Sequence, residues 1–326
     1  MRRLSRKPEP GLRIKWSGFR PMYDFWGHEL KRYYQLETLA NATQKLLHEK
    51  DRFILPSIQS VMGPTEITAL AFELFQEGRY QLIFRLNAMN ARKKRASFGF
   101  VAAKNAEEAS AVARNEHRIL RDLHLRAPQS IVQPFKGGAI YLPDRYRRPS
   151  HGREIYAYLT QWLHGYDELG INKNLQCIAN IPRTHTFTLA ETETIKGHIV
   201  EILFRTYDPK SRTAMALPEI ASGDFVINWS KKEALKLKLI ACRSMAAKTD
   251  PARILEQLLR TSWDWNGRRF YLFPAEPETL FTTMIQTLGP DQAKHAVKHC
   301  LESVRKKDRP SYLNEYLEAL GQLMVK

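Results

Sequence analysis

The sequence has few cysteines and no long apolar segment. Its 326 residues include only Cys177, Cys242 and Cys300, which are widely spaced and form no Cys-x-x-Cys pair. This usage argues against a disulfide framework and against structural zinc. No run approaches the roughly 20 apolar residues of a membrane span, and the N-terminus has arginines but not the apolar segment of a secretory signal. We therefore expect a protein of the reducing cytoplasm that has no membrane span.

Acidic residues are also scarce relative to basic ones. Lysine and arginine number 51 against 34 aspartates and glutamates, which gives a net charge of +17. A hydrophobic content of 43% indicates a folded globular protein, and the length suffices for one large domain or two ordinary ones. Such a charge attracts polyanions such as nucleotides, nucleic acid, acidic proteins or an anionic lipid surface, without choosing among them. The basic residues are dispersed over the first twenty residues and over residues 92–95, 145–153 and 305–309.

The clearest structural pattern covers residues 66–123. Residues 67–74 and 79–86 form two runs with a period of two residues on either side of Gly78, a pattern typical of an antiparallel hairpin. A basic turn and a short third strand at residues 97–104 follow. Apolar residues then recur at helical spacing over residues 107–123. The order predicted here is three strands followed by one helix.

The segments on either side of this pattern are less regular. We assign residues 1–22 to a basic mobile arm and residues 23–64 to a helical extension, whose main helix runs from Asp24 to about residue 50. Further along, Gly137 and Gly138 separate two apolar runs and predict another hairpin. An arginine-rich loop at residues 143–153 and a strand at residues 155–163 come next.

From about Leu189 the sequence becomes helical, and Asp208-Pro209 ends the first of these helices. Residues 218–230 interrupt the helical pattern. Residues 234–242 either alternate as a strand or continue a helix that begins at Ser230 in a capping box. The remainder predicts further helices, among them one at residues 250–259, two separated at Gly289, and one at residues 311–324.

Two motifs in the first half resemble the protein-kinase-like superfamily, which includes protein kinases and aminoglycoside-type phosphotransferases. Val101-Ala-Ala-Lys104 is similar to the lysine motif on strand three of that family, and Glu116 lies where its helix glutamate would lie. The resemblance implies that Lys104 contacts nucleotide phosphates and that Glu116 holds Lys104. It also places the adenine-facing hinge at residues 161–165, with Gln161 and Leu163 as nucleotide contacts. The same sequence pattern is also expected without a nucleotide site, if Lys104 reaches water at the end of a strand and Glu116 lies on a solvated helix face.

A third motif, Gly-Asp224-Phe…Asn228, resembles the catalytic loop of the phosphotransferase branch. The resemblance implies that Asp224 acts on the acceptor hydroxyl and that Asp224 and Asn228 hold the metal. The loop departs from the family because Ser222 replaces a histidine and the asparagine follows four rather than five residues after the aspartate. A second alignment makes Asp224 the metal ligand and Asp208 the catalytic residue.

Other parts of the family pattern are missing. The stretch around Gly78 has one glycine where a phosphate loop has several, and no Asp-Phe-Gly follows the catalytic loop. If residues 234–242 are a strand, Cys242 or Arg243 stands where the second metal-binding carboxylate should be. The sequence therefore resembles a degraded or divergent kinase site in which one carboxylate or one metal ligand is missing.

Together these observations predict a two-lobed α+β fold with a small β-rich lobe at residues 65–165 and a helical lobe at residues 166–326. The expected ligands are ATP and magnesium between the lobes, and the expected role is phosphoryl transfer or, as a pseudokinase, partner binding. Two alternatives stay open. One is a nucleic-acid-binding protein that uses the basic arm and the loops at residues 92–95 and 145–153. The other is an adaptor that binds no small molecule.

Overall fold

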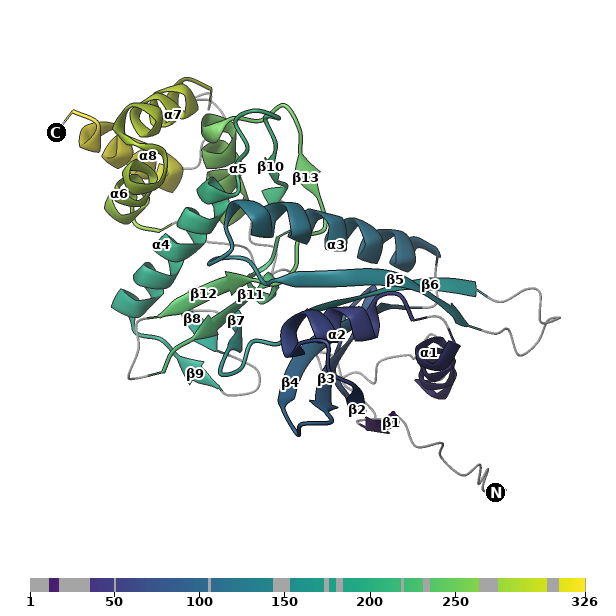
Figure 1. Cartoon of the computed structure of the whole chain (residues 1–326). Helices are drawn as coiled ribbons and strands as arrows, with labels where there is room; N and C mark the ends of the chain where they lie inside the picture. Colours follow the sequence, from purple (N-terminus) through teal and green to yellow (C-terminus); the bar gives the residue numbers. More distant parts are fainter. Residues whose placement is uncertain are drawn as a thin grey trace. The chain divides into compact units, whose positions relative to one another are not determined.

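The computed structural model describes most of the chain (Figure 1). The described residues are 12–17, 36–49, 51–104, 107–142, 153–172, 176–179, 184–217, 220–230, 235–263, 275–303 and 311–325. Within them the chain forms eight α-helices and several largely antiparallel sheets, so the predicted α+β class is confirmed. Most of the predicted arm, residues 24–35 of the predicted extension, and nearly all of the arginine-rich loop lie outside the described residues. No helix of the described part has the length and apolar composition needed to cross a bilayer.

The described elements fall into two compact units, each treated by itself below. The first unit comprises Met1–Arg118 and Gln133–Trp162, and the second comprises Ile119–Val132 and Leu163–Lys326. The second unit therefore takes a short segment, which ends helix α3, from within the sequence of the first. The division at Trp162 lies beside the predicted hinge.

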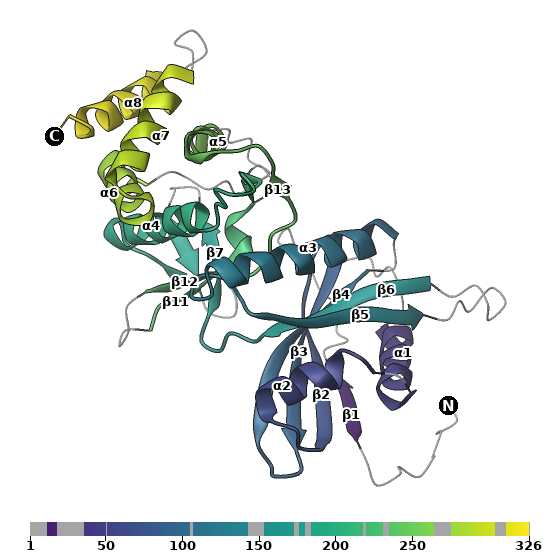
Figure 2. The same ribbon diagram turned by 45° about the horizontal axis from the view of Figure 1, so that its top comes forward.

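A six-stranded sheet in the order β1-β2-β3-β4-β6-β5 forms the first unit (Figure 2). Its strands are β1 (Arg13–Ser17), β2 (Ile67–Glu77), β3 (Gln81–Asn90), β4 (Arg95–Ala103), β5 (Pro134–Leu142) and β6 (Arg153–Gln161). The predicted hairpin around Gly78 and the third strand are confirmed as β2, β3 and β4, which pair antiparallel. Phe72, Phe84 and Phe100 are all fully buried and lie on one face of this sheet.

Residues 13–17, which the sequence analysis assigned to the arm, form β1 and pair parallel with β2. The reason is an inward-pointing aromatic ring. Trp16 stacks on Phe72 with ring centroids 4.2 Å apart and meets the edge of Phe84 at 5.3 Å. Burial of an indole on an aromatic face stabilises a strand that has few other apolar residues.

The hairpin predicted at Gly137 and Gly138 is wrong, because β5 runs through both glycines without turning. These glycines make room for side chains. A Cβ on Gly138 would lie 2.6 Å from the ring of Phe53, and one on Gly137 would lie 2.5 Å from the Tyr156 hydroxyl. Glycine in a strand interior often marks such a close approach.

Three helices pack on this sheet. Helices α1 (Leu36–Glu49) and α2 (Ile54–Met62) contact β5, and α2 also contacts β4 and β6. Asp51 accepts hydrogen bonds from the backbone N–H groups of Phe53 and Ile54, at 3.0 and 2.8 Å, and so caps α2. The predicted third helix is α3 (Glu107–Arg126), and its Ser110 hydroxyl accepts a hydrogen bond from the Tyr156 backbone of β6 at 3.2 Å.

The second unit begins with strands, although the sequence analysis assigned residues 166–326 to a helical lobe. Its five-stranded sheet has the order β12-β11-β7-β8-β9, and β10 and β13 form a separate pair. The strands are β7 (Asp167–Ile171), β8 (Cys177–Ala179), β9 (His185–Thr186), β10 (Ala214–Met215), β11 (Phe225–Asn228), β12 (Lys236–Leu239) and β13 (Met245–Ala246). Residues 236–239 are thus a strand and do not continue a helix from Ser230. Most of these strands have four residues or fewer, too short for a periodic signal.

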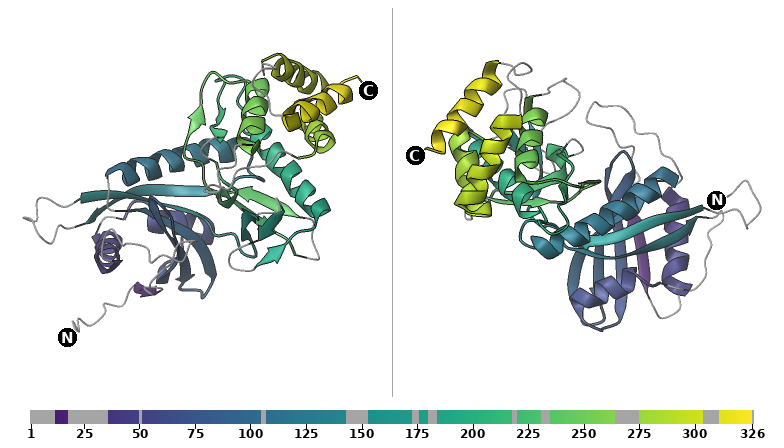
Figure 3. Two further views of the ribbon diagram at one scale, coloured as in Figure 1. Left: turned by 180° about the vertical axis from the view of Figure 1, so that it is seen from behind. Right: turned by 90° about the horizontal axis from the view of Figure 1, so that it is seen from above.

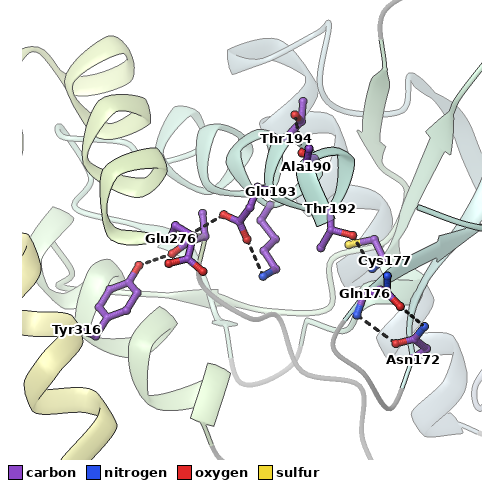
Figure 4. A network of polar contacts seen from close by, with 11 residues as sticks. Asn172, Gln176, Cys177, Ala190, Thr192, Glu193, Thr194, Glu276 and Tyr316 are labelled. Carbon is purple, nitrogen blue, oxygen red and sulfur yellow. Dashed lines mark hydrogen bonds and ion pairs between the residues drawn. The ribbon is translucent and has the colours of Figure 1, made fainter. Parts of the chain in front are cut away.

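The helices of this unit agree with the predicted pattern (Figure 3). They are α4 (Leu189–Arg205), α5 (Pro251–Trp263), α6 (Pro277–Leu288), α7 (Pro290–Ser303) and α8 (Ser311–Leu323). A polar network ties α4 to the C-terminal helices (Figure 4). Glu193 on α4 accepts from Lys196 at 2.8 Å and from the Glu276 backbone at 2.7 Å, and the Tyr316 hydroxyl on α8 donates to the Ala275 carbonyl. Burial raises the pKa of Tyr316 well above its ordinary value, so the tyrosine remains a donor.

Candidate functional site

Lys104 is buried beside a carboxylate of the first unit. It follows the last residue of β4, and its backbone N–H donates to the Tyr80 carbonyl at 2.8 Å. Its ammonium lies 2.7 Å from Glu77 Oε1, and the two side chains are only 7% and 3% exposed. The sequence analysis did not identify Glu77, which ends β2 immediately before Gly78. The Glu77 carboxylate holds the lysine side chain in place at this buried position.

Glu116 lies in the same polar region at the end of the sheet. Its Oε1 accepts from the Tyr158 hydroxyl at 2.6 Å and from the Gln81 side-chain amide at 3.2 Å. Gln81 begins the strand that follows the turn after Glu77, and the backbone N–H of Gly78 donates to the Gln81 carbonyl. The expected contact of Glu116 with Lys104 stays a prediction.

His117, beside Glu116, fixes helix α3 to the sheet. Its Nε2 lies 2.7 Å from the Phe135 carbonyl, and its Nδ1 lies 2.8 Å from the Tyr156 hydroxyl. Because a carbonyl only accepts, Nε2 carries a proton and donates to Phe135, and Nδ1 shares a hydrogen bond with the Tyr156 hydroxyl. The ring also stacks on Tyr158, with centroids 4.8 Å apart.

The two expected hinge residues fall at the division between the units. Gln161 ends β6 and donates its backbone N–H to the Gln133 carbonyl at 2.8 Å, within the first unit. Leu163 begins the segment of the second unit, where its carbonyl accepts from the Tyr166 backbone at 3.4 Å. Their contact with an adenine stays a prediction.

Asp224 is buried in the second unit and is bound by an arginine. Both guanidinium nitrogens of Arg243 donate to it, NH1 to Oδ2 at 3.0 Å and NH2 to Oδ1 at 2.9 Å. The Ala221 backbone N–H also donates to Oδ2 at 2.8 Å. The Asp224 side chain is 6% exposed, whereas that of Arg243 is 37% exposed. Bidentate pairs of this kind are among the strongest hydrogen-bonded contacts of a carboxylate.

The backbone explains why Arg243 reaches Asp224. Strands β11 and β12 pair antiparallel, and the Ile240 backbone donates to the Asp224 carbonyl at 2.8 Å. Arg243 therefore lies just beyond the end of β12. The kinase-like pattern would have a second metal-binding carboxylate there, and this sequence has Cys242 or Arg243 at that place. A basic residue at a position expected to be acidic was the available signal for this ion pair.

Asn228 is not brought to the Asp224 carboxylate. Residues 225–228 form strand β11, and four extended steps separate the two Cα atoms by about 13 Å. The Asn228 side-chain oxygen instead accepts from the Ser230 backbone at 3.1 Å. These residues do not fit a shared magnesium site, because one side chain is paired with a cation and the other lies far along a strand. No group of three metal-ligating side chains occurs anywhere in the described residues.

Asp208, the catalytic residue of the second alignment, closes a turn. It accepts from the Lys210 backbone at 3.0 Å and from the Ser211 hydroxyl at 2.5 Å, and Arg126 lies 3.5 Å away. The Ser211 hydroxyl and then the Lys210 backbone lower the pKa of Asp208. The residue is therefore an ionised turn former.

A further cluster of polar and aromatic side chains, in the five-stranded sheet of the second unit, was not predicted. The Trp229 indole donates to Asp167 Oδ2 at 2.6 Å, and the ring of His185 stacks on Trp229 with centroids 4.3 Å apart. Asp167 is 1% exposed, so its carboxylate depends on such donors. The three residues are far apart in the sequence and carry no common motif, so no signal pointed to the group.

The chain was also compared with known proteins. Neither the protein-family models nor the curated proteins give a match to this sequence.

Proposed function

We propose that this chain is a non-catalytic protein of the kinase-like class, a pseudokinase that acts by binding a partner. The order of strands and helix in the first unit, with Lys104 after β4 and Glu116 on α3, supports the class. So does the Asp224-Phe segment that leads into the β11–β12 hairpin. The loss of catalysis is supported by one observation, the bidentate pair of Arg243 with Asp224.

The pair removes both functions that the resemblance assigns to Asp224. A general base needs a free lone pair within reach of the acceptor hydroxyl, and a metal ligand needs an oxygen that faces the ion. Both Asp224 oxygens accept guanidinium N–H groups, and Oδ2 accepts a backbone N–H as well. A divalent cation at this position would also be repelled by the arginine at short range.

ATP and magnesium, the ligands implied by the resemblance, are the test ligands for this proposal. ATP phosphates at Lys104 would have to share its ammonium with the Glu77 carboxylate, which already lies 2.7 Å away. A phosphate brought beside a buried carboxylate is repelled by it, which weakens binding. We therefore expect little or no gain in thermal stability from ATP, with or without magnesium.

The experiment compares the full chain with Asp224→Asn and, as a matched control, with Asp208→Asn. Each protein is assayed for magnesium-dependent ATP turnover and for its thermal unfolding midpoint. We expect no turnover above background in any of the three. We also expect Asp224→Asn to lower the midpoint by several degrees, because a structural ion pair is lost.

A catalytic aspartate would behave differently. Active-site carboxylates are commonly held at a cost in stability, so neutralising one tends to leave the midpoint unchanged or to raise it. Magnesium-dependent turnover that disappears in Asp224→Asn but survives in Asp208→Asn would overturn the proposal. An unchanged midpoint in Asp224→Asn would remove its main support.

A further inference from the structure

The outer face of β1 to β4 carries a hollow of about 690 Å³. We call it the basic groove and define it by its four cationic lining residues, Arg13, Lys15, Arg85 and Arg95. The lining contains no aspartate or glutamate. It lies entirely within the first unit and shares no residue with the Asp224 region.

Strand register explains the depth of this groove. Arg13 and Lys15 lie opposite Ala69 and Ala71, and Asn87 lies between Ala71 and Ser97 on the neighbouring strands. Small side chains on the central strands leave room that the longer cations border. Adjacent strands are about 4.8 Å apart, so β1 and β4 are separated by roughly 14 Å across the groove.

The four cations are not neutralised by the described protein. None of the four cations forms an ion pair with any residue that the structure describes. In addition, the Nε of Arg85 is buried without a hydrogen-bond acceptor. Glu73 is paired with Arg85 in the strand register but is exposed and makes no ion pair with it. Four like charges around one hollow repel each other, and a bound anion would relieve both the repulsion and the unmet donor.

Aromatic side chains continue the groove at Arg85. The Arg85 guanidinium lies 5.7 Å from the ring centroid of Trp162, and Phe75 meets Trp162 edge-on at 5.0 Å. Phe75 is 37% exposed, which is unusual for a phenylalanine on a sheet. The face thus combines unpaired cations with accessible ring surfaces.

From this combination we infer that the basic groove binds single-stranded nucleic acid. Phosphates contact Arg13, Lys15, Arg85 and Arg95, and an unstacked base packs against the Phe75–Trp162 pair. Proteins that bind single strands combine a positive groove for the backbone with aromatic surfaces for the bases. The inference is independent of catalysis at Asp224, because it concerns other residues, all of them in the first unit.

An acidic peptide is the competing occupant, and the aromatic pair argues against it. Carboxylates would satisfy the four cations equally well, but they offer no apolar surface to the exposed ring of Phe75. Bases offer a flat apolar surface at every nucleotide, and stacking on an aromatic side chain contributes substantially to binding.

The test uses the full chain and a fluorescein-labelled 15-nucleotide oligo(dT), with fluorescence anisotropy read at several salt concentrations. Each phosphate contact on a single strand contributes about −0.7 to the slope of log affinity against log salt, so four contacts give about −2.8. We expect Arg85→Gln/Arg95→Gln to make the slope less negative by about 1.4 and to weaken binding at least tenfold at low salt. Arg13→Gln/Lys15→Gln should have the same effect on the slope and the affinity. This second double variant keeps the test valid if the first one fails to fold.

Two further variants complete the design. Lys45→Gln/Arg52→Gln removes the same charge from exposed positions elsewhere in the unit and should leave affinity within about twofold and the slope unchanged. Trp162→Leu should weaken binding about fivefold or more while leaving the salt slope unchanged, because it removes stacking and no charge.

The outcomes separate the explanations. Equal losses in the groove and control pairs would show attraction to net charge alone and would overturn the inference. Competition by polyglutamate as effective as by unlabelled oligo(dT), with no effect of Trp162→Leu, would assign the groove to an acidic protein. Absence of oligo(dT) binding at about 50 mM salt would also overturn it.

Discussion

Lys104 and Asp224 are charged residues that the resemblance assigns to a nucleotide site, and each faces an opposite charge in its own unit. Glu77 lies against Lys104, and Arg243 binds Asp224. A buried charge is costly unless it is paired, so these partners determine what either residue can do. The sequence identified the two residues but not their partners, because a partner is chosen by distance in space. Lys104→Met would thus be a poor test for nucleotide binding, since it also leaves Glu77 buried and unpaired.

The ion pair of Arg243 with Asp224 should contribute to the stability of the second unit. Arg243→Met keeps most of the side-chain volume but leaves the Asp224 carboxylate buried without its cation. We expect it to lower the free energy of unfolding by about 2 kcal/mol, below the 3–5 of a fully buried pair, because Arg243 is 37% exposed. Thermal and urea unfolding of the full chain measure the loss.

The double variant Asp224→Asn/Arg243→Met provides the control for this prediction. It removes both charges, so it should be more stable than Arg243→Met alone, and the two substitutions should be non-additive by about 1 kcal/mol. Additive losses would mean that the ion pair contributes little and that each residue acts through other contacts.

At the scale of elements, two glycine patterns in the same sheet had different outcomes. Gly78 lies in the turn between β2 and β3, and its N–H donates to Gln81, as a hairpin requires. Gly137 and Gly138 look like a stronger turn signal but lie inside β5, beside Tyr156 and Phe53. A Cβ on Gly137 or Gly138 would clash with these side chains, whereas one on Gly78 would meet only the Gln81 carbonyl oxygen at 3.7 Å, so the three-dimensional neighbours distinguish the two roles. Sequence periodicity therefore predicted the long strands and helices but not this connection.

A capping box at the N-terminus of helix α4 should stabilise the protein in a pH-dependent way. Thr188 accepts from the Glu191 backbone at 3.2 Å, while Glu191 accepts from the Thr188 backbone at 2.8 Å, which completes a capping box. Thr188→Ala should cost about 1 kcal/mol at neutral pH, or a few degrees of thermal midpoint. Thr194→Ala is the matched control, because this exposed threonine donates only to the Ala190 carbonyl within the same helix, and it should have little effect (Figure 4).

The Thr188 hydrogen bonds lower the pKa of Glu191 below its ordinary value of 4.5. Because the folded-state pKa is the lower one, the contribution of the Glu191 carboxylate is complete above pH 4.5 and is lost as the pH falls through the folded-state value. The difference in midpoint between the full chain and Thr188→Ala should therefore shrink on acidification through this range. A difference that stays constant down to the lowest pH at which both proteins fold would contradict the role of the carboxylate.

For the whole molecule, the sequence predicted the α+β class but not how the chain divides. The sequence analysis placed one boundary near residue 165, whereas Ile119–Val132 belongs with the second unit. Leu120 and Leu123 are fully buried, and the periodicity that revealed them says only that one face of α3 is covered. Which unit covers it depends on contacts between residues more than a hundred positions apart, which no local pattern records.

Residues 119–132 should be needed for the second unit to fold. Residues 130–132 flank strand β12, because Val132 donates to the Leu239 carbonyl at 2.9 Å and Leu239 donates to the Ser130 carbonyl at 2.8 Å. A fragment of residues 163–326 lacks these bonds and the buried leucines of α3. We expect it to lose a cooperative thermal transition, because an open edge of strand β12 and uncovered apolar surface remain.

Restoring the segment should restore the fold. The Gln161 backbone donates to Gln133, so residues 132 and 163 are near each other in space and a Gly/Ser linker of about six residues can join them. Residues 119–132 linked in this way to residues 163–326 should unfold cooperatively by circular dichroism, whereas the same linker on a scrambled 14-residue segment should not. If residues 163–326 alone unfold with the same midpoint as the linked fragment, the segment is not part of the second unit. The cooperativity of the fragment thus reports directly on whether the end of helix α3 completes this unit.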